Sequence, residues 1–586
     1  MSIGEGLRMR PGRPYLAIRG GIRSAGWFWA SSGLSLLGYT ALFVSLHLHS
    51  LGWAPSQVLQ QIDAYWQIFY RSIFSENRVT ASPRSALAEQ HPLLLLLVFA
   101  ILALGYLLSL VRIRALPAAS RPSLRALLAL AAAFSVPLLL LPNLLSGDVY
   151  SYISFGRIAT LHGGNPFIDP PNRFPFDPYL RWVDWSSVPS VYGPTWVYLS
   201  VLVTVLVESV WSHVVAYVLV YKLIALLLHL LNGALIWSIL WHWRPEQRQW
   251  GTALYLLNPL ALIEFAGSAH NDVLMITLIL AGILLHLRGL WLWAVAAFTL
   301  AVLTKWIALP LLPLYALLLV GSDSSPMRRL KYAAGVGGIA ALLSAGLYLP
   351  YWEGPATLKI LLNAPPQKRL INSVGAMLVD EIQYGLYWLG RAPHPLTDDY
   401  LLIKPRVEAV DPVEQLEGPT WETRQRTRLR RYELELQREQ SELVRSKRAL
   451  EGAVRTLSLS AVLVACVLGA LATRGLRTML LAAAWIFFTY TTIGAVWVWP
   501  WYATWFVALA ALLDWRVTGR AAVLLSTLVL LIYPLFPELP VPAPAGRFRA
   551  LIVFGPPLVF AGYHLARLVR SYVRGEWRLD DLARLN

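Results

Sequence analysis

The stretch PLLLLLVFAILALGYLLSLV, residues 92–111, contains twenty consecutive residues without a charged side chain. An α-helix rises about 1.5 Å per residue, so a helix of this length spans roughly 30 Å, the thickness of the hydrocarbon core of a bilayer. Similar apolar runs occur at residues 26–48, 124–145 and 333–349. This repetition predicts an all-α polytopic membrane protein.

The composition of the whole chain agrees with this class of protein. Of the 586 residues, 56% are hydrophobic and 14% are charged, which is more apolar than a water-soluble domain with one core requires. Many of the 25 Trp and 26 Tyr residues lie at the ends of apolar runs, where they anchor helices among lipid headgroups. Cys466 is the only cysteine, so no intramolecular disulfide can form.

The formal net charge of +17 comes mainly from Arg residues in short loops between the apolar runs. Basic residues in such loops face the cytoplasm and meet anionic lipid. We therefore expect membrane lipids and no nucleic acid as partners. The first 25 residues are also basic, and residues 26–48 are too long for the core of a signal peptide, which favours a retained anchor.

The loop charges are consistent with a topology of about fourteen spans and both termini in the cytoplasm. The predicted spans are residues 26–48, 92–113, 125–145, 213–243, 250–268, 272–288, 290–304, 306–320, 333–350, 456–472, 478–497, 502–515, 521–537 and 550–570. This arrangement places residues 146–212, the turns at His270 and Lys305, and residues 351–455 on the side away from the cytoplasm. Residues 194–212 are apolar enough to be a further crossing, but only an interfacial helix keeps Arg244 and Arg248 inside.

The topology divides the chain into four parts. Residues 1–123 contain the cytoplasmic N-terminus and two spans, and residues 124–350 contain seven spans with the outer loop 146–212. Residues 351–455 form an outer loop with a charged insertion, and residues 456–586 contain the last spans and a cytoplasmic tail. In the insertion, leucines recur every seventh residue from Leu429, but polar residues separate them, so a helix along its own chain is favoured over a two-stranded zipper.

The outer loop begins with GDVYSYISFGR, residues 147–157. Asp148 follows the span that ends near residue 145, and Tyr150, Tyr152 and Arg157 follow at nearly helical spacing. A carboxylate held at the membrane surface beside aromatic and basic groups suits a general base that acts on a lipid-borne substrate. The alternative is that Asp148 only caps the helix that begins at Val149.

The turn AGSAHND places His270 and Asp272 between two apolar runs at the same side. Ionisable residues at membrane depth are functional candidates by default. His270 and Asp272 are also candidate ligands of a divalent metal, but no third ligand is defined. Asp272 is also a candidate cap of the following helix.

Basic side chains on this side are candidate phosphate ligands. Lys305 lies in the outer turn LTKW, where it either snorkels to the interface or meets a lipid phosphate. Lys368 and Arg369 lie after the span 333–350, where they either close over the same site or form a solvated basic patch. The motifs GxxxxGK[ST], GxSxG and HExxH do not occur, so a nucleotide-driven pump or a serine hydrolase lacks its usual signature.

These segments together carry a family resemblance. GDVYSYISFGR, GGNPF, YGP, NPLALIEFAGSAHNDVLM, LTKW and WVWPWY occur in this order, and the chain resembles the polytopic, lipid-sugar-dependent glycosyltransferases of the GT-C type. It is most similar to the bacterial polyprenol-phosphate-mannose-dependent α-1,6-mannosyltransferases. The resemblance covers roughly residues 124–351 and 479–505, whereas the first two spans and the insertion at 393–455 lie outside the common pattern.

The resemblance implies a GT-C fold with a seven-helix core at residues 124–350 and interfacial helices in its first outer loop. It implies that Asp148 is the general base, that the donor is a sugar, expected to be mannose, on polyprenyl phosphate, and that the acceptor is a glycan or glycolipid hydroxyl. His270, Lys305, Lys368 and Arg369 are the expected donor-phosphate ligands. The expected substrate-binding residues are Tyr150, Tyr152, Arg157, Asn165, Tyr192, Asp272, Trp501 and Tyr502.

The expected reaction is a single displacement that inverts the anomeric carbon. Two other functions remain open from the sequence. A lipid-linked saccharide flippase or transporter would line a path with ionisable residues on several spans near mid-bilayer, and a scaffold would use the helix at residues 421–454 for assembly.

Overall fold

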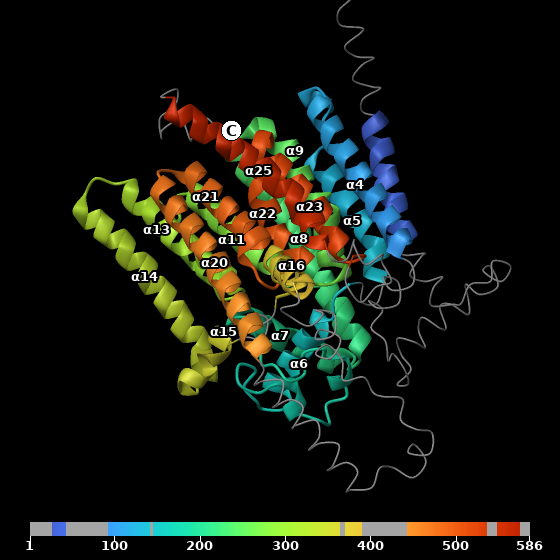
Figure 1. Cartoon of the computed structure of the whole chain (residues 1–586), viewed down its shortest axis with the longest axis vertical. Coiled ribbons are helices and arrows are strands. Elements are labelled where there is room, and N and C mark those ends of the chain that lie inside the picture. Colours follow the sequence, from blue (N-terminus) through green and yellow to red (C-terminus); the bar gives the residue numbers. More distant parts are fainter. Residues whose placement is uncertain are drawn as a thin grey trace, which may run out of the picture. The chain divides into compact units, whose positions relative to one another are not determined.

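The structure is a computed structural model that describes residues 26–42, 92–140, 145–363, 370–389, 442–535 and 548–574. Within these ranges the regular elements are helices, and no strand occurs; an isolated bridge joins Ile371 and Trp497. The all-α prediction is therefore confirmed for the described part of the chain (Figure 1).

The helices follow one another along the chain with short connections. The N-terminal group comprises residues 26–42, α4 (Pro92–Ala115), α5 (Leu124–Leu140), α6 (Asp148–Thr160), α7 (Pro194–Val210) and α8 (Val214–Trp243). The central group comprises α9 (Arg248–Leu256), α10 (Pro259–Leu262), α11 (Asp272–Leu287), α12 (Trp291–Val302), α13 (Leu311–Gly321), α14 (Pro326–Tyr348), α15 (Lys359–Asn363) and α16 (Val374–Trp388). The C-terminal group comprises α20 (Glu442–Ala472), α21 (Leu476–Thr489), α22 (Ala503–Ala510), α23 (Arg520–Leu528) and α25 (Arg549–Val573).

Seven helices in the described residues are long and apolar enough to cross a membrane. They are Leu93–Ala115, Val214–Trp243, Pro326–Tyr351, Arg448–Ala472, Leu476–Gly494, Trp515–Ile532 and Arg549–Ser571. The pair Pro259–Gly267 and Asp272–Leu287 counts as an eighth if it forms one bent span. The chain is thus a multi-pass membrane protein, and the larger number of about fourteen spans stays a prediction.

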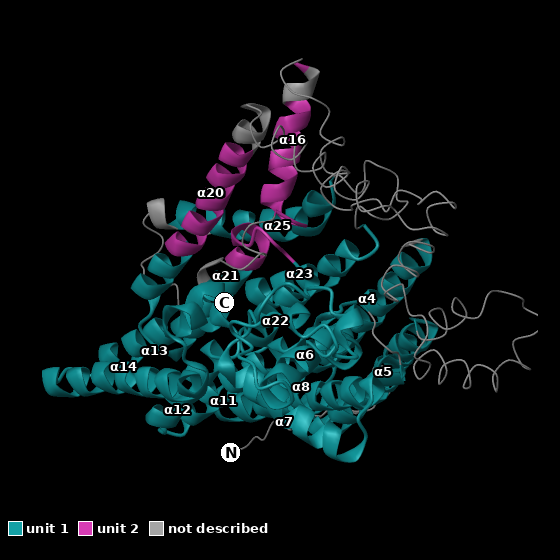
Figure 2. Cartoon of the chain, turned by 90° about the horizontal axis from the view of Figure 1, so that it is seen from below, with its two compact units in different colours: residues 1–365, 465–488, 499–586 teal, residues 366–464, 489–498 magenta. Residues whose placement is uncertain are grey.

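The described chain divides into two compact units, which Figure 2 distinguishes by colour. Unit 1 comprises residues 1–365, 465–488 and 499–586, and unit 2 comprises residues 366–464 and 489–498. In unit 2 the backbone N–H of Ile371 donates to Val496 at 2.8 Å, and the N–H of Val498 donates to Ile371 at 3.0 Å. Every described residue of the candidate site belongs to unit 1.

The predicted span 250–268 is broken in the structure. α9 ends at Leu256, and Asn258 then caps α10 by accepting hydrogen bonds from the backbone N–H groups of Leu260 and Ala261. Pro259 supplies no N–H and suits the first position of a helix, which explains the restart at this point. α10 continues as the π-helix η6 (Ile263–Gly267), and the chain then bends by 117° into α11. This bend positions the HND turn.

The two ends of α8 carry different groups. At its first turns, the Tyr217 hydroxyl donates to Glu208 of α7 at 2.7 Å. Just beyond its last turn, Arg244 lies within range of the charges of Arg477 and Asp514. Arg477 and Asp514 form an ion pair at 3.5 Å. A helix of 30 residues is roughly 45 Å long. The basic loops around Arg244 and Arg477 therefore lie at one end of unit 1, and α6 and α7 lie at the other (Figure 1).

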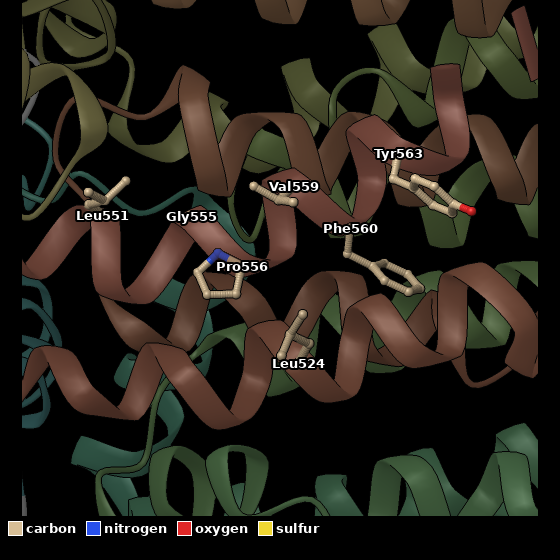
Figure 3. A pocket seen from close by; sticks show the side chains of 7 residues that line it. All are labelled: Leu524, Leu551, Gly555, Pro556, Val559, Phe560 and Tyr563. Atoms are coloured by element: carbon tan, nitrogen blue, oxygen red, sulfur yellow. The ribbon is translucent and has the colours of Figure 1, made fainter. Parts of the chain in front are cut away.

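An apolar groove of about 700 Å³ runs along α25 beside α23 (Figure 3). It is lined by Leu524, Leu551, Gly555, Pro556, Val559, Phe560 and Tyr563. Among the described residues, no acidic or basic side chain lines it, so its surface suits hydrocarbon chains rather than chemistry on a polar substrate.

Candidate active site

Asp148 is the first residue of α6, and its side chain does not cap that helix. Gly147 occupies the N-cap position without a side-chain cap. The Asp148 carboxylate instead accepts a hydrogen bond from the Tyr192 hydroxyl at 2.9 Å. Its side chain is 19% exposed. The cap interpretation is thus wrong for its side chain, and Asp148 presents a supported, reachable carboxylate.

The YGP motif holds Tyr192 in place through its backbone. The N–H of Gly193 donates to Thr304 at 3.1 Å, and the N–H of Thr195 donates to Leu303 at 3.0 Å. A Cβ atom on Gly193 would lie 2.0 Å from the Leu303 carbonyl oxygen, so only glycine permits this approach. The motif therefore joins the phenol beside Asp148 to the segment that carries Lys305.

His270 follows the π-helix η6 in a strained turn. Ala269 has a φ of 59°, which is unfavourable for a residue with a Cβ atom. The His270 imidazole is fully buried and stacks on Trp501 with 3.9 Å between ring centroids. Its Nδ1 lies 3.7 Å from Oδ2 of Asp148. The structure therefore brings His270 beside Asp148.

The second nitrogen of His270 faces the carboxylate of Glu264, which lies in η6. Nε2 lies 3.3 Å from Oε2 of Glu264, which has no solvent exposure. The Tyr533 hydroxyl donates to Oε1 of Glu264 at 2.7 Å. One buried imidazole thus lies between two acids, Asp148 and Glu264.

Asp272 and Lys305 form a close ion pair. Nζ of Lys305 donates to both oxygens of Asp272, at 2.8 and 2.9 Å, and the Trp505 indole N–H also donates to Oδ1. Asp272 is fully buried, whereas the Lys305 side chain is 17% exposed and lies 5.3 Å from the Tyr502 ring centroid. Asp272 thus positions Lys305, and its carboxylate does not cap α11.

Two further tyrosines lie along α6. The Tyr152 hydroxyl accepts a hydrogen bond from the Asn271 backbone N–H at 3.4 Å, and its ring contacts Tyr192 edge-on. Tyr150 stacks on Trp182, and burial together with the nearby Asp184 raises the pKa of Tyr150 to about 12. Both phenols are therefore neutral hydrogen-bonding groups at ordinary pH.

Arg157 is not brought to Asp148. It lies nine residues further along α6, roughly 13 Å by helix rise. Its guanidinium pairs with Asp177 at 2.9 Å and with Glu208, and it lies 4.4 Å from the Tyr179 ring centroid. These contacts fix the outer loop to α6 and α7.

Asn165 also ties segments of the chain together. Its side-chain N–H groups donate to the Tyr351 carbonyl at 2.7 Å and to Glu353 at 2.9 Å. Lys368 and Arg369 lie outside the described residues. In the described ranges, no group of three or more His, Cys, Asp or Glu side chains is arranged to hold a metal ion.

The sequence signals for the remaining site residues differ in strength. Glu264 is the single acidic residue in the apolar segment 251–268, and that position marks it as a candidate. Trp505 and Tyr533 stand among many apolar and aromatic residues, and no local pattern distinguishes them. Asn271 is fully buried, and neither polar atom of its amide has a hydrogen-bond partner among the described residues.

Comparisons with known proteins bear on the chemistry of this site. A sequence model described as the N-terminal domain of α-(1→6)-mannopyranosyltransferases matches residues 69–321. The chain is 30% identical over 183 residues to α-(1→6)-mannopyranosyltransferase A of Mycobacterium tuberculosis, covering 30% of this chain and 34% of that protein. The chain thus spans about a third of the length of this relative. No solved structure matches the chain. The resemblance to the α-1,6-mannosyltransferases is confirmed over the matched region.

Proposed function

Since residues 69–321 resemble the α-(1→6)-mannopyranosyltransferases, we propose that this chain is a membrane glycosyltransferase that transfers mannose from polyprenyl phosphate to a glycan or glycolipid hydroxyl. The observation that carries the proposal is Asp148, a partly exposed carboxylate supported by Tyr192 and adjacent to His270. A polytopic fold with this acid at one end of unit 1 suits a donor held in lipid.

The proposed reaction is one displacement. Asp148 takes the proton of the acceptor hydroxyl, the acceptor oxygen bonds to the anomeric carbon, and the bond from that carbon to the phosphate oxygen breaks. Attack opposite the leaving group inverts the anomeric configuration. The phosphate leaves with an additional negative charge, which a nearby cation stabilises.

Lys305 is the described cation proposed for this role. An ammonium has three N–H donors, and two of them are directed at Asp272. The partial exposure of Lys305 leaves its charge reachable by a phosphate, while Asp272 prevents the side chain from swinging away. Lys368 and Arg369 remain proposed additional ligands. Tyr150, Tyr152, Asn165, Tyr192, Trp501 and Tyr502 are proposed to bind or border the substrates.

The proposed topology has about fourteen spans, cytoplasmic termini and the active site on the opposite side. The separation of the basic loops from α6 and α7 by the length of α8 supports it. α7 is proposed as an interfacial helix of a GT-C core at residues 124–350. In α7 one face is buried, including Trp196 and Val203, and another exposes Leu202 and Val205.

Asp148→Asn tests the proposed function. Purified protein in lipid nanodiscs is supplied with polyprenyl-phosphate mannose and an α-mannoside acceptor, and new glycosidic bonds are measured by mass spectrometry. Loss of a general base lowers such rates by about 10²- to 10⁴-fold. Asp323→Asn is the matched control, because Asp323 lies in the loop before α14 and pairs with Arg328 in the first turn of that helix. Near-normal transfer by folded Asp148→Asn would exclude Asp148 as the base.

A further inference from the structure

Glu264 is a buried carboxylate that has no role in the displacement described above. It lies in the π-helix η6, between α10 and the HND turn, and it has no solvent exposure. An ionised carboxylate in such a place is costly unless other groups compensate its charge. Tyr533 supplies one hydrogen bond to Oε1, and the His270 imidazole lies against Oε2. The Glu264 carboxylate therefore lies where it can stabilise a positive charge on the His270 imidazole.

His270 has the position of an intermediate proton carrier. Its Nδ1 faces Asp148 and its Nε2 faces Glu264, at 3.7 and 3.3 Å. Neither nitrogen makes a hydrogen bond within the described residues. The stacked Trp501 ring fixes the plane of the imidazole. Of the two acids, Asp148 is reachable by a substrate and Glu264 is sealed from solvent.

We propose that His270 receives the proton that Asp148 takes from the acceptor, and that Glu264 is a positioning residue that stabilises the resulting imidazolium. This inference rests on the proposed function. The acceptor O–H bond breaks as the new bond to the anomeric carbon forms, and the departing phosphate keeps the electron pair. The proton passes from Oδ2 of Asp148 to Nδ1 of His270, which restores the Asp148 carboxylate.

Other groups around His270 do not substitute for Glu264. Asp272 lies two residues further on, but Lys305 neutralises it. The hydroxyls of Tyr152, Tyr192 and Tyr533 are neutral, and Trp501 carries no charge. Removing the charge of Glu264 therefore takes away the buried carboxylate that faces Nε2 of His270, and an imidazolium formed there loses that stabilisation.

Glu264→Gln tests the inference through the pH dependence of mannose transfer. The assay uses polyprenyl-phosphate mannose and an α-mannoside with the full chain in nanodiscs. We expect the maximal rate to fall about 10- to 100-fold and the acid limb of the pH–rate profile to move to lower pH by about one unit or more. Glu264→Asp keeps the charge, so its acid limb stays near that of the unaltered protein. A folded Glu264→Gln variant with an unmoved acid limb overturns the inference.

Two further variants keep the test decisive. If Glu264→Gln does not fold, His270→Asn removes the proton carrier, and transfer at the normal rate by that variant overturns the inference. Asp148→Asn separates the two levels of the proposal. No transfer by the unaltered protein contradicts the proposed function itself, and retained transfer in Asp148→Asn contradicts the role of Asp148. Lost transfer in Asp148→Asn together with an unmoved acid limb in Glu264→Gln contradicts only the role of Glu264.

Discussion

At the scale of single residues, Asp272 shows how a buried charge is held at the site. Its carboxylate has no solvent contact, and its partners Lys305 and Trp505 come from segments that are distant in the sequence. A buried pair contributes little net stability, but removing one partner leaves an uncompensated charge. The pair therefore constrains where Lys305 can lie.

Lys305→Met is expected to destabilise the protein by about 3–5 kcal/mol, because the buried Asp272 carboxylate loses its cation and keeps only the Trp505 indole N–H as a partner. The double variant Lys305→Met with Asp272→Leu is expected to recover much of that stability without recovering transfer, since no cation faces the phosphate. Thermal unfolding in detergent and the mannose-transfer assay measure the two effects. Transfer restored in the double variant would contradict the proposed role of Lys305.

Part of this site can be predicted from the sequence. Asp148, His270, Asp272 and Lys305 are polar residues at the borders of apolar runs, and the structure places Asp148 beside His270 and Asp272 beside Lys305. Arg157 is also a polar residue near an apolar run, yet it forms ion pairs with Asp177 and Glu208 and does not reach Asp148. The contacts of Trp501 with His270 and of Tyr533 with Glu264 depend on long-range packing, which no local pattern encodes.

At the scale of structural elements, the YGP turn is positioned by backbone contacts. Gly193→Ala would place a Cβ atom against the Leu303 carbonyl, so the turn has to move and Tyr192 has to leave Asp148. We expect a loss of about 1–3 kcal/mol of stability and a large loss of transfer. Gly338→Ala is the matched control, because a Cβ atom there meets nothing within 4 Å in α14. Equal activity of the two variants would show that the close approach is unnecessary.

The outer loop is attached to α6 by an ionised acid. Although burial opposes it, hydrogen bonds from His162, the Tyr179 backbone and Arg157 lower the pKa of Asp177 below its usual value. A lowered pKa in the folded state stabilises the protein above the unfolded-state pKa of about 3.9, and this contribution is lost as pH falls through the lower folded value.

Asp177→Asn is therefore expected to cost about 2 kcal/mol near neutral pH, the usual scale for hydrogen bonds to a charged group. The difference from the unaltered protein should shrink once the pH falls below about 4. Thermal unfolding of both proteins between pH 7 and pH 3 measures this difference. A difference that does not depend on pH would mean that the charge of Asp177 is not what stabilises the loop.

The extent to which elements could be predicted depends on their length and composition. Long apolar runs such as α4 and α8 begin and end within one residue or two of their predicted limits. The predicted span 250–268 is not one continuous helix, because a new helix begins at Asn258 and Pro259 and continues as the π-helix η6. Pro259 is visible in the sequence, whereas no local sequence pattern predicts the π-helix or the 117° bend.

At the scale of the whole molecule, the proposed orientation can be tested by labelling. In a Cys466→Ser background, Phe176→Cys lies in the loop proposed to face outward, and Ser324→Cys lies in the loop before α14 proposed to face the cytoplasm. Both side chains are exposed. A membrane-impermeant maleimide is expected to label Phe176→Cys in intact cells and Ser324→Cys only after permeabilisation. The reverse pattern would place the active site in the cytoplasm.

The contacts of Trp501, Trp505 and Tyr533 limit which chimeras of related proteins can be active. These residues follow the region matched by the family sequence model, yet they support His270, Asp272 and Glu264 within it. A chimera that takes residues 69–321 from one relative and the C-terminal spans from another would pair each buried polar group with a foreign aromatic partner. We therefore expect active chimeras only when residues 69–321 and the C-terminal spans come from the same relative. Inactive chimeras should regain transfer when these three aromatic residues are restored together.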